Sequence, residues 1–200
     1  MRILVLAGGI GTRLKPLTTF VPKVMMSVHG HPFLYYLVKA YQGHDLVLSV
    51  NYMKESVKNW CRLTKTYLEF VEEPEFMGTG GAIRIAEPFM YGRKKFAVVN
   101  GDTYIEEDMN KIFKSHNSNK DIATVVYAKD MLDNKMRNSG VYVFSQKIFD
   151  YLRKPKVFTL EDKLDSIPHK IYESKKKYLD IGTYKGLTYA KTHLFNERKR

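Results

Sequence analysis

The sequence is poor in cysteine and has no long hydrophobic run. Cys61 is the only cysteine among 200 residues, which excludes an internal disulfide and favours a reducing compartment such as the cytoplasm. No apolar stretch approaches the roughly 20 residues that a membrane-spanning helix needs, so we expect neither a membrane span nor a membrane partner. The N-terminus enters an apolar strand at Ile3, so we expect no signal peptide.

Acidic residues are outnumbered by basic ones. The chain has 33 Lys and Arg against 21 Asp and Glu, a net charge of +12. Such an excess can attract nucleic acid, an anionic membrane or anionic small molecules. The basic residues are scattered apart from Lys175–Lys177 and Arg198–Arg200, and no nucleic-acid motif accompanies them. We interpret these two runs as a solvated face and a frayed end, and expect no nucleic-acid partner.

One glycine-rich stretch near the N-terminus carries the clearest chemical signal. The apolar run Ile3–Leu6 indicates a buried strand, and three glycines follow it closely. Glycine lets the backbone turn sharply, and successive N–H groups in such a turn form a nest for an anion. Arg13 and Lys23 bracket the turn with positive charge, and Thr12 adds a hydroxyl donor. We therefore predict a polyphosphate site rather than an ordinary strand-to-helix turn, which would not need these cations.

Two better-known glycine loops do not fit this stretch. A Walker P-loop requires Gly-Lys-Ser/Thr, whereas Gly11 is followed by Thr12 and Arg13. The dinucleotide fingerprint requires a third glycine at the position that Leu14 occupies.

Apolar periodicity predicts alternating strands and helices. Expected strands are 3–6, 46–50, 67–71, 95–102, 122–127, 138–144 and a short one at 171–172. Expected helices are 32–41, 54–64, 82–90, 108–116, 146–152, one starting at 159–162, and 184–195. This order favours a parallel sheet flanked by helices, in which ligands bind beyond the carboxyl ends of the strands.

The segment 6–23 resembles the signature of the sugar-1-phosphate nucleotidyltransferases, the nucleotide-sugar pyrophosphorylases of the GT-A-like fold. The matching positions are Gly8, Gly9, Gly11, Thr12, Arg13, Leu14, Pro16, Leu17, Thr18, Pro22 and Lys23. Val24 departs from the family, which usually has a second proline there. The resemblance implies a single-domain Rossmann-like, three-layer α/β/α fold with a mostly parallel central sheet. The nucleotidyltransferase domain would span 1–200, with a nucleotide-binding core at 1–127 and the acceptor-binding part with the second metal ligand at 138–195.

The resemblance also implies a reaction, in which a nucleoside triphosphate and a sugar 1-phosphate give a nucleotide-sugar and pyrophosphate. Arg13, Lys23 and Asp102 would be the catalytic residues. The expected nucleotide-binding residues are Leu6, Ala7, Gly8, Gly9, Gly11, Thr12, Glu73, Gly78 and Gly80. Glu73 could accept hydrogen bonds from guanine, or from uracil or thymine, and we favour guanine. A solvated acidic loop is an equally weighted interpretation of Glu73.

Two further motifs resemble the family's metal site. Asp102 ends Asn100–Asp102, and Asp180 lies in Tyr178–Thr183. Both aspartates would bind Mg²⁺, an ion that uses one or two carboxylates together with substrate phosphates. Without the resemblance, an aspartate after a strand is usually a turn residue or a helix cap.

The acceptor side departs most from the family. A longer segment usually follows the strand at 122–127 and contains a lysine that binds the sugar phosphate, whereas only 128–137 intervenes here. Lys129 or Lys135 could substitute, or the acceptor side is simplified. Asn138, Gly140 and Glu161 are the expected sugar-binding residues, although Glu161 also suits the acidic first turn of a helix.

Several alternatives stay open at this point. The chain looks most like the heptose-1-phosphate guanylyltransferases, so we favour GTP and a heptose or hexose 1-phosphate, with homo-oligomerisation possible. The shortened 128–137 segment also fits a non-catalytic nucleotide-sugar sensor, or a transferase for another phosphorylated acceptor such as phosphocholine. The net charge leaves a nucleic-acid-binding domain as the weakest alternative.

Overall fold

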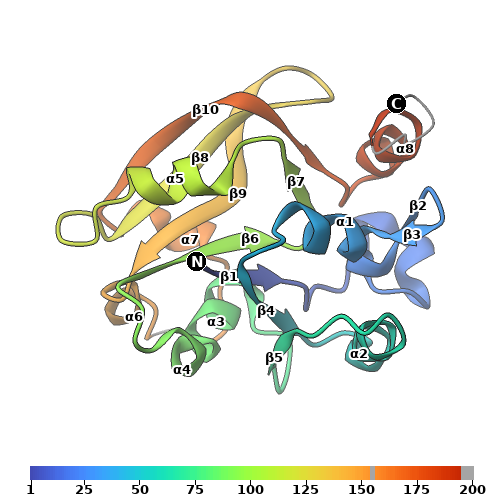
Figure 1. Cartoon of the computed structure of the whole chain (residues 1–200), viewed down its shortest axis with the longest axis horizontal. Helices are drawn as coiled ribbons and strands as arrows, with labels where there is room; N and C mark the ends of the chain where they lie inside the picture. Colours follow the sequence, from blue (N-terminus) through green and yellow to red (C-terminus); the bar gives the residue numbers. More distant parts are fainter. Residues whose placement is uncertain (154–155, 195–200) are drawn as a thin grey trace.

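A single eight-stranded sheet forms the centre of the molecule (Figure 1). It is seen in a computed structural model that describes residues 1–153 and 156–194. In spatial order the strands are β5 (Glu69–Glu72), β4 (Asp45–Val50), β1 (Arg2–Leu6), β6 (Lys95–Asn100), β9 (Met136–Ser145), β8 (Ala123–Asp130), β10 (His169–Asp180) and β7 (Thr103–Ile105).

The half of the sheet around β1 is entirely parallel. β1 pairs with β4 on one side and β6 on the other, and β5 extends the sheet beyond β4. Ile3, Leu4 and Val5 are fully buried, as expected of a strand covered on both faces. The loops that follow β1 and β6 therefore leave the same edge of the sheet side by side.

The other half of the sheet mixes strand directions. β9 runs antiparallel to both β6 and β8, β10 runs parallel to β8, and β7 closes the edge antiparallel to β10. Four of the described neighbour pairs are parallel and three are antiparallel, which confirms the predicted mostly parallel sheet.

Helices cover both faces of the sheet, which confirms the predicted three layers. Alternating residues of β1 belong to different cores: Ile3 and Val5 pack in one cluster and Leu4 in the other. The first cluster lies under α1 (Phe33–Ala40), α2 (Lys54–Leu63), α5 (Met109–Ser115) and α8 (Tyr184–His193). The second lies under α3 (Gly78–Ile85), α4 (Glu87–Met90), α6 (Ile148–Tyr151) and α7 (Glu161–Leu164).

Short elements connect the glycine-rich loop to the first layer. Three 3₁₀ turns span Thr12–Leu14, Leu17–Thr19 and Lys23–Met25, and the small hairpin of β2 (Ser27–Val28) and β3 (His31–Pro32) follows them. None of these was predicted from the sequence, because 3₁₀ turns and two-residue strands carry little apolar periodicity.

Two predicted elements are wrong in extent. The strand expected at 171–172 is the long β10, whose polar run 173–177 hid the pattern because its lysines are exposed. This exposure confirms Lys175–Lys177 as a solvated face. The helix expected at 82–90 begins at Gly78 and is divided at Ala86 into α3 and α4.

Some predictions fall outside the described residues or stay untested. Phe195, the last residue of the expected final helix, and Arg198–Arg200 lie outside the described residues. In the described part of the chain, no helix is both long enough and apolar enough to span a bilayer. The division into nucleotide- and acceptor-binding segments, the cytoplasmic location and homo-oligomerisation stay predictions.

Candidate active site

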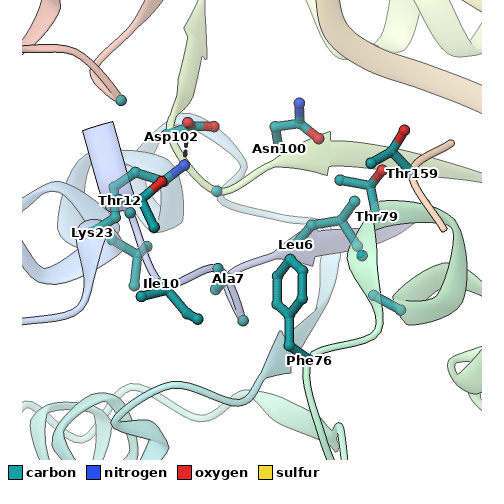
Figure 2. Close-up of a pocket in the computed structure, with 18 of the residues that line it drawn as sticks. Leu6, Ala7, Ile10, Thr12, Lys23, Phe76, Thr79, Asn100, Asp102 and Thr159 are labelled. Atoms are coloured by element: carbon teal, nitrogen blue, oxygen red, sulfur yellow. Dashed lines mark hydrogen bonds and ion pairs between the residues drawn. The ribbon is translucent and has the colours of Figure 1, made fainter. Parts of the chain in front are cut away.

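The glycine-rich loop lines a cavity of about 470 Å³ at the carboxyl ends of β1 and β6. The walls also come from the segment after β5, from α3 and from the segment before α7. Figure 2 shows Thr12, Lys23 and Asp102 gathered at one end, and Phe76, Thr79 and Thr159 at the other. The lining residues are Leu6, Ala7, Gly8, Gly9, Ile10, Gly11, Thr12, Arg13, Lys23, Val24, Glu73, Phe76, Gly78, Thr79, Ala82, Asn100, Gly101, Asp102, Thr159 and Gly182.

The loop requires glycine at two of its positions for different reasons. Gly11 has a left-handed φ of 69°, and a Cβ there would lie 3.0 Å from Cγ2 of Thr18. At Gly8 a Cβ would overlap Oε1 of Glu73. Gly9, by contrast, has no atom within 4 Å of the place of a Cβ, so its backbone borders open space.

Lys23 and Asp102 form an ion pair at the charged end of this cavity (Figure 2). Lys23 starts a 3₁₀ turn, whereas Asp102 follows β6 after Gly101. Both side chains are largely buried, with 21% and 10% of their surfaces exposed. The pairing keeps two buried charges compensated in a place with little solvent.

Asp102 and Asp180 lie beside each other although 78 positions separate them in the sequence. A Cβ on Gly182 would lie 2.7 Å from Oδ2 of Asp102 and 2.7 Å from Oδ1 of Asp180. The backbone N–H of Gly182 donates to Oδ1 of Asp180 at 2.6 Å. Nη2 of Arg13 lies 3.4 Å from Oδ2 of Asp180. Two cations and two carboxylates therefore meet at one place.

The two carboxylates titrate differently because their surroundings differ. Burial and the adjacent charge of Asp102 raise the pKa of Asp180 to about 6. Burial also disfavours ionised Asp102, but the ammonium of Lys23 outweighs it and holds the pKa of Asp102 below its usual value. A pair of like charges this close favours binding of a cation.

A second cavity of about 200 Å³ shares a wall with the first. Arg13, Asn100 and Asp102 line both cavities. The other lining residues of the second cavity are Thr103, Asn138, Ser139, Gly140, Tyr142, Glu161, Tyr178 and Asp180. The structure thus brings the expected acceptor residues Asn138, Gly140 and Glu161 together beside the metal-ligand candidates.

An irregularity in β9 shapes this second cavity. The pairing of β8 with β9 shifts register between Val125 and Tyr127. Gly140 lies in the shifted stretch with a φ of 74°, and a Cβ there would lie 2.5 Å from Nδ2 of Asn100. The Gly140 N–H donates to Oδ1 of Asn138 at 3.0 Å. Only glycine therefore allows Asn100 and the bulged strand to approach this closely.

Glu73 is buried, so the interpretation of a solvated acidic loop is wrong for this residue. It is 4% exposed, and its Oε1 accepts a hydrogen bond from Oγ of Ser49 at 2.8 Å. Burial raises the pKa of Glu73, and hydrogen bonds from Ser49 and the Met77 backbone partly offset that effect. Its neighbour Glu72 is the solvated residue, paired with lysines of α2.

The glycines at positions 78, 80 and 81 at the start of α3 form a second cluster, which owes part of its composition to packing. A Cβ on Gly80 would overlap the ring of Phe158, and a Cβ on Gly78 would overlap the Phe158 backbone. The Gly80 N–H donates to the Phe158 carbonyl at 3.1 Å, and the Phe158 N–H donates to the Met77 carbonyl at 3.1 Å. Gly78 lines the first cavity, whereas contact of Gly80 with a nucleotide stays a prediction.

Comparison with known proteins decides the family. Residues 2–136 match the family model described as nucleotidyl transferase, which is more than half of the chain. The chain belongs to the nucleotidyl transferase family.

Two known proteins are similar to this chain over most of their own length. HddC from Yersinia pseudotuberculosis was solved as a complex with GMP-PN. Its structure matches this one with a TM-score of 0.82 and 29% sequence identity, and the match covers 95% of this chain and 97% of the HddC chain. The D-glycero-alpha-D-manno-heptose 1-phosphate guanylyltransferase of Campylobacter jejuni is 26% identical over 81% of this chain and 84% of its own.

Other relatives are longer than this chain. The bifunctional protein GlmU of Methanocaldococcus jannaschii is 26% identical over 92% of this chain but only 50% of its own length. The chain thus spans about half the length of the first curated relatives that it matches.

Several residues that line the cavities were not predicted from the sequence. Phe76, Thr79 and Thr159 line the first cavity, and Tyr142 lines the second. Their contribution depends on contacts between distant segments, since the stretch before α7 packs on α3. Thr79 lies between Gly78 and Gly80, which the sequence predicted to bind the nucleotide, and this position is the signal that could have identified it.

Proposed function

We propose that this nucleotidyl transferase condenses a nucleoside triphosphate with a sugar 1-phosphate, giving a nucleotide-sugar and pyrophosphate. GTP and a heptose or hexose 1-phosphate are the favoured substrates. One observation carries the proposal: two cations and two carboxylates meet at the wall shared by two cavities. Transfer between two ligands requires such a meeting point, because catalysis of phosphoryl-group chemistry is mainly positioning and charge stabilisation.

The larger cavity suits the nucleotide. The glycine loop presents backbone at one end, and Arg13 and Lys23 supply positive charge for the phosphates. Buried Glu73 lines the cavity and accepts hydrogen bonds from Ser49 and the Met77 backbone, and its carboxylate would use its remaining acceptor positions for N1–H and N2–H₂ of guanine. The GMP-PN complex of HddC supports the preference for guanine.

Asp102 and Asp180 are the residues that would hold Mg²⁺. Their adjacent carboxylates form a hard oxygen donor set that fits this ion. Among the described residues, no group of three or more His, Cys, Asp and Glu side chains forms a complete metal cage. Substrate phosphates would then complete the coordination. When bound there, the ion would offset negative charge near the α-phosphate.

The smaller cavity suits a hydroxyl-rich acceptor. Asn138 and Glu161 offer amide and carboxylate groups to hydroxyls, and the cavity adjoins Arg13. A quaternary ammonium such as that of phosphocholine is usually bound by exposed aromatic faces. The tyrosines here are Tyr142 and Tyr178, which are 0% and 5% exposed, so they offer little ring surface to such a group.

The chemical step needs no protein base. A phosphate oxygen of the acceptor attacks the α-phosphorus, the bond from the α-phosphorus to the bridging oxygen breaks, and pyrophosphate leaves. The attacking phosphate is already an anion at neutral pH. Arg13 and the loop amides would stabilise the leaving pyrophosphate, and Lys23 would hold the α-phosphate near the incoming oxygen.

Pyrophosphate release from a panel of nucleoside triphosphates and sugar 1-phosphates tests the proposal. Release that requires both partners and is fastest with GTP is expected. The shortened 128–137 segment favours a non-catalytic sensor as second candidate, because its ends extend β8 and β9 and only 131–135 connect the two strands. Tight nucleotide-sugar binding without release from any pair would support that sensor and contradict the transferase.

A further inference from the structure

The carboxylate of Glu161 is held on both of its oxygens. The Tyr142 hydroxyl donates to Oε1 at 2.9 Å, and the Thr79 hydroxyl donates to Oε2 at 3.1 Å. Each donor is itself oriented by another group. Nδ2 of Asn138 donates to the Tyr142 oxygen at 3.0 Å, and the Leu160 N–H donates to the Thr79 oxygen at 2.7 Å. The donors thus form a continuous chain with Glu161 at its centre.

This chain connects the two cavities. Thr79, at the start of α3, lines the larger cavity, while Tyr142 of β9 and Glu161 of α7 line the smaller one. The wall of the nucleotide cavity therefore holds part of the acceptor cavity in place.

Tyr142 is fixed in its position as a donor. Its side chain is fully buried, and its ring stacks on Phe144 with 5.7 Å between centroids and 11° between planes. Burial and then the nearby charge of Glu161 raise the pKa of Tyr142 far above its usual value, so the hydroxyl keeps its proton. A phenol that never ionises can donate to Glu161 at every physiological pH.

The simpler role of Glu161, an acidic residue in the first turn of a helix, does not account for these contacts. α7 has only four residues, and no side chain caps its N-terminus. The carboxylate instead bonds to side chains of β9 and α3. A carboxylate has about four acceptor positions, so two donors leave capacity for hydroxyls in the cavity.

We propose that Tyr142 and Thr79 are positioning residues that fix Glu161 for recognition of acceptor hydroxyls. This inference rests on the proposed function. It assigns part of the acceptor affinity to residues that act through Glu161.

The test is the Tyr142→Phe variant, which removes one hydroxyl and keeps the ring. Losing one hydrogen bond to a charged group should raise the acceptor KM about tenfold. The KM for GTP and the kcat at saturation should stay within about twofold, because Tyr142 does not line the nucleotide cavity. Thr124→Val is the matched control, because it removes a buried hydroxyl that bonds to His116 on the far side of the sheet.

Action through Glu161 is tested by a double-mutant cycle. In a Glu161→Gln background, Tyr142→Phe should change the acceptor KM less than about twofold. Thr79→Val should raise the acceptor KM, and Thr79→Ser, which keeps the hydroxyl, should restore it. An unchanged acceptor KM in Tyr142→Phe would overturn the inference, as would a tenfold effect that persists in the Glu161→Gln background.

Calorimetry separates this inference from the proposed function. Mannose 1-phosphate is titrated into the full chain in the presence of a non-hydrolysable GTP analogue. Binding by the wild type that weakens about tenfold in Tyr142→Phe supports the positioning role even where no pyrophosphate is released. Equal binding by the two proteins overturns it, and a wild type that neither binds nor consumes any sugar phosphate of the panel overturns both.

Discussion

The carboxylates of Asp102 and Asp180 face one another across the position where Gly182 lacks a side chain. Asp102 follows the end of β6, and Asp180 is the last residue of β10. The Ile181 N–H donates a hydrogen bond to the Asp102 carbonyl at 2.9 Å. This backbone link holds the two strand ends in a fixed relation. The distance between the acids is thus set by the sheet rather than by a flexible loop.

Asp102→Asn is expected to reduce Mg²⁺-dependent product formation about 100-fold or more, because removal of one charge-stabilising group from such a site costs that order. Pyrophosphate release at increasing Mg²⁺ measures it. Asp108→Asn is the control, since Asp108 caps α5 and asparagine is an equally good cap. Unchanged turnover in Asp102→Asn would remove this residue from the metal site.

Arg13→Ala is expected to lower turnover far more than stability. Its side chain is 60% exposed and its ion pair with Asp180 is long, so unfolding in urea should change by less than about 1 kcal/mol. Turnover should fall about 100-fold if Arg13 stabilises the leaving pyrophosphate. The surface pair of Arg93 with Asp45 provides a matched control, Arg93→Ala. Equal losses of turnover in the two variants would contradict the assignment.

Glu73→Gln is expected to weaken the preference for guanine. A glutamine presents an N–H₂ group where the carboxylate accepted, so kcat/KM with GTP should fall about 10- to 100-fold while UTP changes less. Glu72→Gln, one residue away on the solvated side, should leave the ratio unchanged. A GTP-to-UTP ratio that is unaltered in Glu73→Gln would show that another group selects the base.

His116 should make stability depend on pH. Burial lowers its pKa to about 4, and the positive charges of Lys95 and Lys170 act in the same direction against Asp121. The unfolded chain binds a proton near pH 6.5 and the folded chain only near 4, so stability is complete above about 6.5 and falls as pH drops between these values.

The expected loss from this histidine at pH 5 is about 2 kcal/mol. Urea unfolding at pH 7 and pH 5 measures the difference in unfolding free energy between the two conditions. In His116→Gln this difference should be smaller by the contribution of the histidine. His193→Gln is the control: it changes an exposed histidine and should keep the full pH dependence of stability. If the unfolding free energy of His116→Gln falls between pH 7 and pH 5 as much as that of the wild type, other groups cause the acid sensitivity.

The sequence could predict the parts of the site that are local. The strand, glycine turn and Arg13 lie within 13 residues, and the backbone needs of such a turn restrict its composition. Asp102 and Asp180 could be paired only through a family motif, because nothing between them indicates that β6 and β10 end at the same edge. The structure confirms that their carboxylates lie close together, since both lie 2.7 Å from the place of a Cβ on Gly182.

Other parts of the site could not be predicted because their role depends on tertiary contacts. Tyr142 stands in the apolar run Val141–Phe144 and looks like an ordinary core residue of a strand. Its hydroxyl becomes significant only where α7 approaches β9. Phe158 explains why Gly80 has no side chain, yet these residues lie 78 positions apart. The length of β10 was hidden because three consecutive exposed lysines, at an irregularity in its pairing with β8, interrupt the apolar alternation.

The site contains two ion pairs, Lys23 with Asp102 and Arg13 with Asp180, so each of these four charges already has a counter-ion. A ligand that carries phosphate oxygens and a divalent cation presents the same two signs in the same small volume. On binding, each protein charge can exchange one partner for another of the same sign. For Lys23 and Asp102, whose side chains are largely buried, the cost of desolvation has therefore been met during folding, whereas Arg13 stays solvated until a ligand binds.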